Sequence, residues 1–298
     1  MTVTDILPEP VLLDGGMGRE LGFRGVEVSR YIWSAQALLD APDVVREIHA
    51  DYIAAGADII TTNTYCTLRS HLDKAGVADR YEELNRLAGA LAVEARESAD
   101  RPVLIAGSLA PMFESYRPDM VLPAAESEPV YREQAAILAD YVDMFICETM
   151  SKSDEAVAAA RAAAATGKPV WVSFNLHPSK HGYVRSGETI GEAVAALDGI
   201  PVSGFLANCC MPELIEAGMP ELVNTGSRFV GGYANTFLPT PDDWTLEEND
   251  LHNLREDLEP PAYLEFVEAW LDKGATVVGG CCGTRPAHIR AIANVLGR

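Results

Sequence analysis

The chain has 298 residues, of which 48% are hydrophobic and 22% charged, and this length is ample for a full hydrophobic core. Its 23 Lys and Arg residues against 44 Asp and Glu residues give a net charge of −21. A charge this negative repels nucleic acid and anionic membranes, so we expect neither as a partner. The sequence contains no run of 18 apolar residues without a charge, and its N-terminus lacks a basic start and an apolar signal core. We therefore expect a cytoplasmic protein.

Eight short apolar segments recur along the chain and are predicted to be strands. In chain order they cover residues 11–14, 58–63, 103–108, 144–148, 170–174, 204–208, 229–233 and 276–280. They are apolar throughout rather than alternating, which is typical of parallel strands buried on both faces.

The segments between the strands have helical periodicity and often end in glycine. Leu84, Leu87 and Leu91 fall on one face of a helix, and Gly56, Gly167 and Gly274 each come just before a predicted strand. Eight such units predict an α/β fold, a (β/α)8 TIM barrel, formed by residues 1–298 as a single domain. An open doubly wound sheet is the competing fold, but no Gly-x-Gly-x-x-Gly follows the first strand. Residues 234–260 are predicted to form a long loop after the seventh strand.

Polar residues stand at the ends of the predicted strands, where a barrel places its active site. They are Asp14, Asn63, Ser108, Glu148, Ser173, Asn208, Cys209, Asn235, Cys281 and Cys282. Polar residues at such positions also serve as simple helix caps, so the prediction of a site depends on the cysteines among them.

Six cysteines in a chain of this length do not form a secreted disulfide scaffold, and clustered cysteines in a reducing compartment more often bind metal or take part in catalysis. Cys281 and Cys282 can point to one place only if the strand ends there and the chain turns, which Gly283 permits. A third thiol comes from residues 206–210. Three such thiolates describe a zinc site with an open fourth position, and zinc sites of this kind are catalytic.

The remaining cysteines carry weaker predictions. Cys147 lies inside an apolar strand and is expected to be a small buried hydrophobe. A disulfide between Cys281 and Cys282 would be strained, so we do not expect one. The roles of Cys66 and Cys210 are left open.

Together these residues resemble the zinc-dependent homocysteine S-methyltransferases, which include the betaine and S-methylmethionine enzymes and the homocysteine module of methionine synthase. The resemblance extends over nearly the whole chain. It rests on residues 13–18 (LDGGMG), 33–34 (WS), 56–58 (GAD), 62–65 (TNTY), 148–149 (ET), 208–209 (NC), 233–235 (YAN) and 279–283 (GGCCG). The family fold is a (β/α)8 barrel, which agrees with the prediction made above from the strand pattern.

The resemblance implies a role for each matching residue. Cys209, Cys281 and Cys282 would be the ligands of Zn²⁺. Asp14 and Glu148, assigned as the catalytic pair, would bind the amino end of homocysteine together with Gly15. The substrate pocket implied by the matching segments is completed by Trp33, Ser34, Tyr65 and Asn235.

The methyl donor is less well defined than the acceptor. Many relatives carry Gly-Pro after the third strand, whereas this chain has the different loop 108–119 there, which is expected to face the donor. The sequence shows no cobalamin or folate module, which favours a small sulfonium or ammonium donor. We place S-methylmethionine ahead of S-adenosylmethionine and betaine, although Phe113, Tyr116 and Trp244 could surround a quaternary nitrogen. The sequence leaves open the oligomeric state and whether selenohomocysteine or another thiol is an acceptor.

Two other functions are kept as alternatives. One is a zinc barrel hydrolase or aldolase, although such sites favour His and carboxylate ligands and the six His residues here form no H-x-H or H-E-x-x-H array. His49 and His288 are instead expected on solvent-facing helices. The other is a non-catalytic zinc-binding or thiol-binding relative. The presence of both Asp14 and Glu148 is evidence against this alternative.

Overall fold

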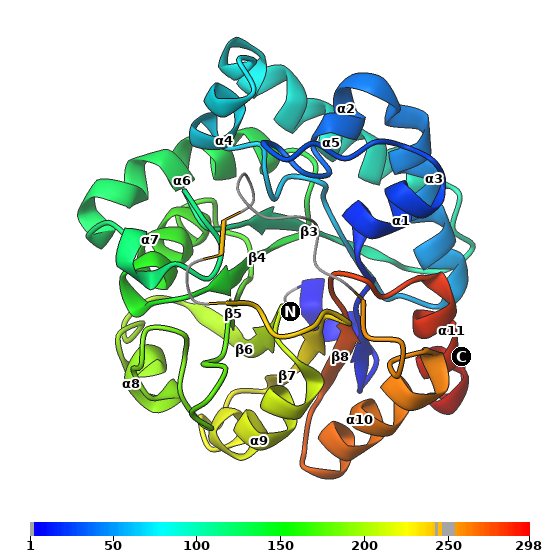
Figure 1. Cartoon of the computed structure of the whole chain (residues 1–298), viewed down its shortest axis with the longest axis vertical. Coiled ribbons are helices and arrows are strands. Elements are labelled where there is room, and N and C mark those ends of the chain that lie inside the picture. Colours follow the sequence, from blue (N-terminus) through cyan, green and yellow to red (C-terminus); the bar gives the residue numbers. More distant parts are fainter. Residues whose placement is uncertain (1–2, 242–243, 246–253) are drawn as a thin grey trace.

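The computed structural model describes residues 3–241, 244–245 and 254–298. Eight parallel strands surround a central axis and helices form an outer ring, as Figure 1 shows. The strands are β1 (Val11–Leu12), β2 (Ile59–Thr61), β3 (Leu104–Leu109), β4 (Met144–Met150), β5 (Val170–Phe174), β6 (Val202–Asn208), β7 (Phe229–Ala234) and β8 (Val277–Gly280). All eight predicted strands are present, with ends that differ by up to two residues.

The strands pair in the order β1-β8-β7-β6-β5-β4-β3-β2. A parallel bridge between Leu13 and Ile59 joins β1 to β2, and the Asp14 amide donates to the Ile59 carbonyl at 3.0 Å. These contacts bring the two ends of the sheet together. The predicted (β/α)8 barrel is therefore confirmed.

The helices connect successive strands and bury their apolar faces against the barrel. They are α1 (Met17–Phe23), α2 (Gln36–Asp40), α3 (Pro42–Ala55), α4 (Arg69–Lys74), α5 (Tyr81–Glu97), α6 (Ala124–Leu138), α7 (Ser153–Ala164), α8 (Ile190–Ala195), α9 (Pro212–Val223), α10 (Pro260–Asp272) and α11 (Pro286–Val295), with 3₁₀ turns η1 (Val3–Ile6), η2 (Ala78–Arg80) and η3 (Pro118–Met120). Gly56, Gly167 and Gly274 adopt positive φ between a helix and the next strand, as predicted.

The core has two layers because side chains alternate along each strand. One set packs between strands and helices, and the other fills the interior of the barrel. On β4, Met144 and Ile146 point into the barrel while Phe145 and Cys147 pack outward, so Cys147 is a buried hydrophobe as expected. The next inward position on β4 is Glu148, at the carboxyl end of the strand.

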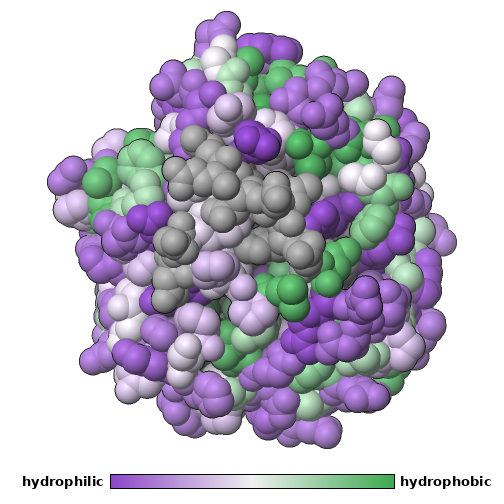
Figure 2. Space-filling model, in the orientation of Figure 1, coloured by the Kyte–Doolittle hydropathy of each residue, from purple (hydrophilic) through white to green (hydrophobic). Residues whose placement is uncertain are grey.

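The face of the molecule shown in Figure 2 is rich in hydrophilic residues, in keeping with the net charge of −21. In the described part of the chain, none of the helices has both the length and the apolar character that a membrane span requires. The parts of the predicted long loop that are described, residues 235–241, 244–245 and 254–259, contain neither a helix nor an extended strand. Residues 242–243 and 246–253 of that loop lie outside the described residues.

The prediction that His49 and His288 face solvent was wrong. His49 is fully buried on α3, which packs against α5 and α11, and burial lowers the pKa of its imidazole to about 4. His288 is also buried, and both of its ring nitrogens have partners, because Nδ1 accepts the Arg285 backbone amide at 3.1 Å and Nε2 contacts the Leu258 carbonyl. Both histidines are therefore parts of the packing between helices.

Gly231 in β7 lies against the backbone of β8. A Cβ atom at this position would lie 1.7 Å from the carbonyl oxygen of Val277 in β8, a backbone atom that cannot move aside. We expect Gly231→Ala to lower the free energy of unfolding by at least about 2 kcal/mol, because it forces these strands apart. Urea denaturation measures this change.

The matched control is Gly22→Ala in α1, where an added Cβ would meet nothing within 4 Å. Alanine is the better helix former, so this variant should be unchanged or more stable by up to about 1 kcal/mol. Equal stability of the Gly231→Ala variant and the wild type would contradict the close approach of β7 and β8.

Candidate active site

A cavity of about 140 Å³ opens at the carboxyl ends of the strands. Its walls include nine of the ten residues that the sequence assigned to metal or substrate, namely Asp14, Gly15, Trp33, Ser34, Tyr65, Glu148, Cys209, Cys281 and Cys282. Asn235 is the exception. It lies in the loop after β7. Its backbone N–H donates to the Cys210 carbonyl at 3.1 Å, and its side-chain Oδ1 accepts the Phe237 backbone N–H at 3.3 Å. It shapes the loop behind Cys209.

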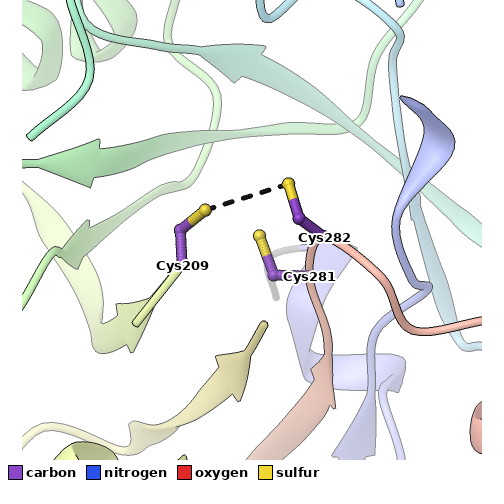
Figure 3. Close-up of side chains that lie close together, drawn as sticks. All are labelled: Cys209, Cys281 and Cys282. Carbon is purple, nitrogen blue, oxygen red and sulfur yellow. Dashed lines mark hydrogen bonds between the residues drawn. The ribbon is translucent and has the colours of Figure 1, made fainter. Parts of the chain in front are cut away.

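Three thiols converge in this cavity from the carboxyl ends of β6 and β8, which lie on either side of β7 (Figure 3). The Sγ atoms of Cys209, Cys281 and Cys282 all lie within 4.8 Å of one another, and Cys209 and Cys282 are 3.9 Å apart. Strand β8 ends at Gly280, and the chain turns at Gly283 with φ of 85°, as predicted. Cys209 follows the end of β6 with a left-handed φ of 52°, which breaks the alternation of the strand.

The geometry of the three thiols fits a bound metal ion. Metal–sulfur bonds of about 2.3 Å in a tetrahedron place the sulfurs about 3.8 Å apart, close to the separation of Cys209 and Cys282. Without an ion, the hydrogen bond with Cys209 and burial raise the pKa of the Cys281 thiol well above its ordinary value. The bare cluster therefore favours protonated thiols, and a cation is what would hold three thiolates together. Cys209, Cys281 and Cys282 would hold such an ion at the edge of the cavity, where a further ligand could reach it.

The turn that carries Cys281 and Cys282 packs tightly against the loop after β1. The Thr284 hydroxyl donates to the Cys281 carbonyl at 2.7 Å, and the Tyr52 hydroxyl lies 3.0 Å and 3.1 Å from the Gly16 and Thr284 carbonyls. A Cβ on Gly16 would come within 2.7 Å of the Cys281 carbonyl. The glycine pair 15–16 is therefore required for this approach, which fixes the position of the thiols relative to Asp14.

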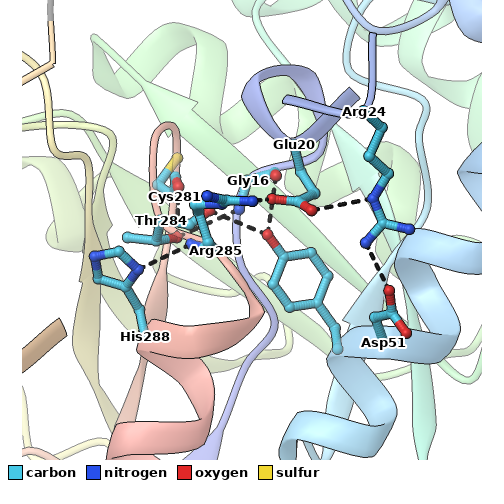
Figure 4. A network of polar contacts seen from close by, with 9 residues as sticks. Gly16, Glu20, Arg24, Asp51, Cys281, Thr284, Arg285 and His288 are labelled. Atoms are coloured by element: carbon cyan, nitrogen blue, oxygen red, sulfur yellow. Dashed lines mark hydrogen bonds and ion pairs between the residues drawn. The ribbon is translucent and has the colours of Figure 1, made fainter. Parts of the chain in front are cut away.

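An ion-pair network secures this contact from the outside (Figure 4). Glu20 on α1 binds Arg285 at 2.9 Å and Arg24 at 3.0 Å, and Arg24 binds Asp51 on α3 at 2.6 Å. Arg285 directly precedes α11, where His288 accepts its backbone amide. The network thus joins α1, α3 and the start of α11 beneath the cysteine turn.

Two carboxylates are buried in the same cavity. Glu148 accepts hydrogen bonds from the Ser108 hydroxyl and, at 3.3 Å, from the Tyr233 hydroxyl. Asp14 accepts the Thr61 amide at 2.7 Å and the Thr61 hydroxyl at 3.0 Å. Burial raises the pKa of Glu148 to about 7 and that of Asp14 to about 8, despite these hydrogen bonds. A cationic ligand would stabilise the ionised forms of both carboxyl groups, because its charge would offset the hydration that they lose on burial.

Other polar residues at the strand ends support the site from behind. The Asn208 side chain accepts the Thr149 amide at 2.8 Å and the Ser173 hydroxyl at 2.7 Å, so it links β4, β5 and β6. Asn63 accepts the Ser34 hydroxyl at 2.6 Å and donates to the Ser34 carbonyl at 3.0 Å. These amides serve as structural connectors, which is the ordinary role of polar residues at strand ends.

The loop after β3 supplies residues that sequence reasoning largely missed. The Tyr116 hydroxyl lies 3.0 Å from the Cys209 sulfur, and the Tyr116 ring meets Trp244 edge-on with ring centres 5.4 Å apart. The sequence had suggested these two aromatic residues only as part of a donor cage. Lys74 and Glu114 also line the cavity. Glu114 belongs to the loop 108–119 that was expected to face the donor, whereas no sequence pattern pointed to Lys74.

The burial of Glu148 has a consequence for stability. A carboxyl group whose folded pKa is raised from 4.5 to about 7 favours folding below pH 4.5 and loses that contribution as the pH rises through 7. Gln cannot ionise, so Glu148→Gln should become more stable relative to wild type as the pH rises over this range, by on the order of 3 kcal/mol. Denaturation of the metal-free, reduced proteins from pH 4.5 to 8 measures this difference.

Glu155 provides a positive control outside the cavity. It is buried on α7, accepts the Ser151 amide at 3.0 Å, and burial raises the pKa of its carboxyl group to about 7 as well. Glu155→Gln should show the same trend with pH. A constant difference between the Glu148→Gln variant and wild type at every pH would refute the role of burial.

The comparisons with known proteins agree with this geometry. Residues 11–296 match the model of the family described as homocysteine S-methyltransferase. The chain is 30% identical to homocysteine S-methyltransferase 4 of Zea mays over 96% of its own length and 89% of that protein. It is 29% identical to the selenocysteine Se-methyltransferase of Brassica oleracea var. italica, over 94% and 87% of the two chains. The metallated form of the homocysteine methyltransferase MmuM from Escherichia coli superposes with a TM-score of 0.81 at 27% identity, over 97% and 96% of the chains. The chain belongs to the homocysteine S-methyltransferase family.

Proposed function

We propose that this protein is a methyltransferase that moves a methyl group from a small sulfonium or ammonium donor to the thiol of L-homocysteine, giving methionine. The observation that carries the proposal is one cavity that contains three converging thiols and two buried carboxylates. Membership of the family supports the same reaction. The whole barrel, residues 1–298, would act as one homocysteine-binding unit.

We assign the metal as zinc, with Cys209, Cys281 and Cys282 as its protein ligands. The all-thiolate donor set, with separations suited to a tetrahedron and one position left open, supports this choice. When bound, zinc would lower the pKa of a coordinating thiol and so supply a thiolate at neutral pH. All six cysteines are free, which suits a reducing compartment such as the cytoplasm.

The carboxylates would bind and orient the acceptor. Glu148 and Asp14 can receive the homocysteine ammonium, and that charge would compensate their burial. Holding the amino end fixes the position of the sulfur near the cysteines, and orientation of this kind can contribute roughly 7–11 kcal/mol in the best cases. Gly15, Trp33, Ser34 and Tyr65 would complete the walls around the acceptor.

The transfer itself needs no general base at the methyl carbon. The acceptor sulfur forms a bond to the methyl carbon as the bond from that carbon to the donor sulfur or nitrogen breaks, and the electron pair of the broken bond leaves with the donor. The donor thereby loses its positive charge and the acceptor its negative charge. A site that excludes water favours this neutralisation, because bulk solvent would stabilise the separated charges.

S-Methylmethionine is the donor that we favour, ahead of betaine. The thioether that departs from a sulfonium is a better leaving group than the tertiary amine that departs from a quaternary ammonium, so a sulfonium donor needs fewer aromatic side chains to stabilise it. Phe113, Tyr116 and Trp244 do line the cavity, and they would flank the positive centre of either donor. One relative is named a selenocysteine Se-methyltransferase, so the acceptor tests should include selenocysteine beside homocysteine.

The metal assignment predicts the effect of removing one thiol. The purified, reduced protein should bind about one zinc per chain, and Cys281→Ala should abolish both tight zinc binding and methyl transfer, because two thiolates do not complete the ligand set. Elemental analysis and a homocysteine methylation assay measure the two quantities. Cys147→Ala is the control, since that thiol packs outward in the core and should not affect zinc binding. A full complement of zinc in the Cys281→Ala variant would disprove the assignment.

The assignment of Glu148 predicts a selective loss. Glu148→Gln keeps the shape of the side chain but removes its charge, so kcat/KM for homocysteine should fall by tens of fold, which corresponds to about 1.5–3 kcal/mol for a charged hydrogen bond. Zinc content should stay the same. Glu155→Gln, which also changes a buried carboxylate but lies outside the cavity, should retain the wild-type value. Unchanged kcat/KM in the Glu148→Gln variant would refute this role.

A further inference from the structure

We propose that Lys74 and Glu114 form the binding site for the amino-acid end of the methyl donor, with Lys74 receiving its carboxylate and Glu114 its ammonium. The proposal rests on the function proposed above and names the donor class, a sulfonium that carries an α-amino acid. Both side chains line the same cavity as the three thiols.

The two side chains are held in place by a regular set of contacts between α4 and the loop after β3. The Ser70 hydroxyl donates to the Met112 carbonyl, the His71 ring contacts the Phe113 carbonyl, and Lys74 Nζ binds Glu114 Oε1 at 2.5 Å. Successive residues of the loop thus meet successive positions on one face of α4. The charges of the ion pair are therefore positioned before any ligand arrives.

The ion pair is buried enough to bind a charged ligand, unlike an ion pair that is fully exposed to solvent. The Glu114 side chain is only 6% exposed and that of Lys74 is 29% exposed. An ammonium has three N–H donors and a carboxylate has several acceptor positions, so each group can bind an opposite charge while the pair stays in contact. A zwitterion placed alongside would match both charges at once.

The pair is connected to the thiols through the loop that follows β3. Glu114 precedes Tyr116 by two residues, a span of at most about 7 Å, and the Tyr116 hydroxyl lies 3.0 Å from the Cys209 sulfur. Between them, the Ser115 hydroxyl binds the Tyr65 hydroxyl at 2.7 Å. In this arrangement the charged end of the donor would bind at Lys74 and Glu114, and its sulfonium would point into the cavity that the thiols also line.

The charge of the cavity also points to Lys74. Among the described residues that line it, Lys74 is the only Lys or Arg, whereas Asp14, Glu114, Glu148 and the three clustered cysteines can each carry a negative charge. A donor carboxylate in this cavity needs a cation partner, and Lys74 is the side chain that supplies one. The acceptor's ammonium already has Glu148 and Asp14 in the proposed arrangement.

The test uses the zinc-loaded enzyme, homocysteine and three sulfonium donors that differ in charge. S-Methylmethionine carries both an ammonium and a carboxylate, dimethylsulfoniopropionate carries a carboxylate alone, and trimethylsulfonium carries neither. Lys74→Met should raise the donor KM at least tenfold for the first two and leave the third unchanged. Glu114→Gln should raise it at least tenfold for S-methylmethionine alone. The KM for homocysteine should stay the same in both variants.

Two further variants separate ligand binding from a purely structural contact. Glu133→Gln removes the partner of Arg69 in an exposed ion pair that joins α4 to α6, so it should change no donor KM. The double exchange Lys74→Glu with Glu114→Lys keeps an ion pair between α4 and the loop but exchanges its charges. The double variant should recover any thermal stability that the single variants lose with the ion pair. It should not recover the wild-type KM for S-methylmethionine.

Three results would overturn the proposal. They are equal losses with all three donors, a loss confined to the KM for homocysteine, and recovery of the S-methylmethionine KM in the double exchange. Absence of methyl transfer from every donor by the zinc-loaded wild type would instead refute the proposed function, and this site with it.

Discussion

The alternation of side chains along parallel strands is the constraint from which the site follows. Each strand fills the barrel with apolar residues and then presents its next inward position at the carboxyl end. In this way Met144 and Ile146 are followed by Glu148, and Leu206 is followed by Asn208. Cysteines that continue this pattern would not converge by themselves. The departures from it, at Cys209 and at the turn through Gly283, bring the three sulfurs to one point.

The cavity contains more buried groups that can carry a negative charge than groups that can carry a positive one. Asp14 and Glu148 have raised pKa values because burial disfavours their ionised forms, and the clustered thiols face the same difficulty. The protein alone therefore leaves the site short of positive charge. A metal ion, the acceptor's ammonium and a cationic donor would each reduce this deficit. Binding of any of them would then stabilise the folded chain through linkage.

The sequence predicted the barrel well because its eight strands are apolar throughout and are separated by helical segments that end in glycine. It also identified the residues of the site that belong to strand ends. Prediction from the sequence failed where the position of a side chain depends on contacts between segments that are distant in the chain. His49 was misplaced because the packing of α3 against α5 and α11 cannot be read from the periodicity of α3 alone. The pairing of Lys74 with Glu114 was missed because it joins a short helix to an irregular loop 40 residues away.

Four non-glycine residues in the described chain have positive φ, namely Trp33, Tyr116, Thr149 and Cys209. Three of them line the cavity, and the fourth directly follows Glu148. A side chain in this region of φ costs on the order of 1–3 kcal/mol, and glycine would largely avoid that cost. Glycine would relieve this backbone strain, but it would also remove side chains that are buried at Tyr116, Thr149 and Cys209. Packing of these side chains therefore holds the strained backbone in place at or beside the cavity, so an evolutionary change at any of these positions would alter strain, packing and cavity together.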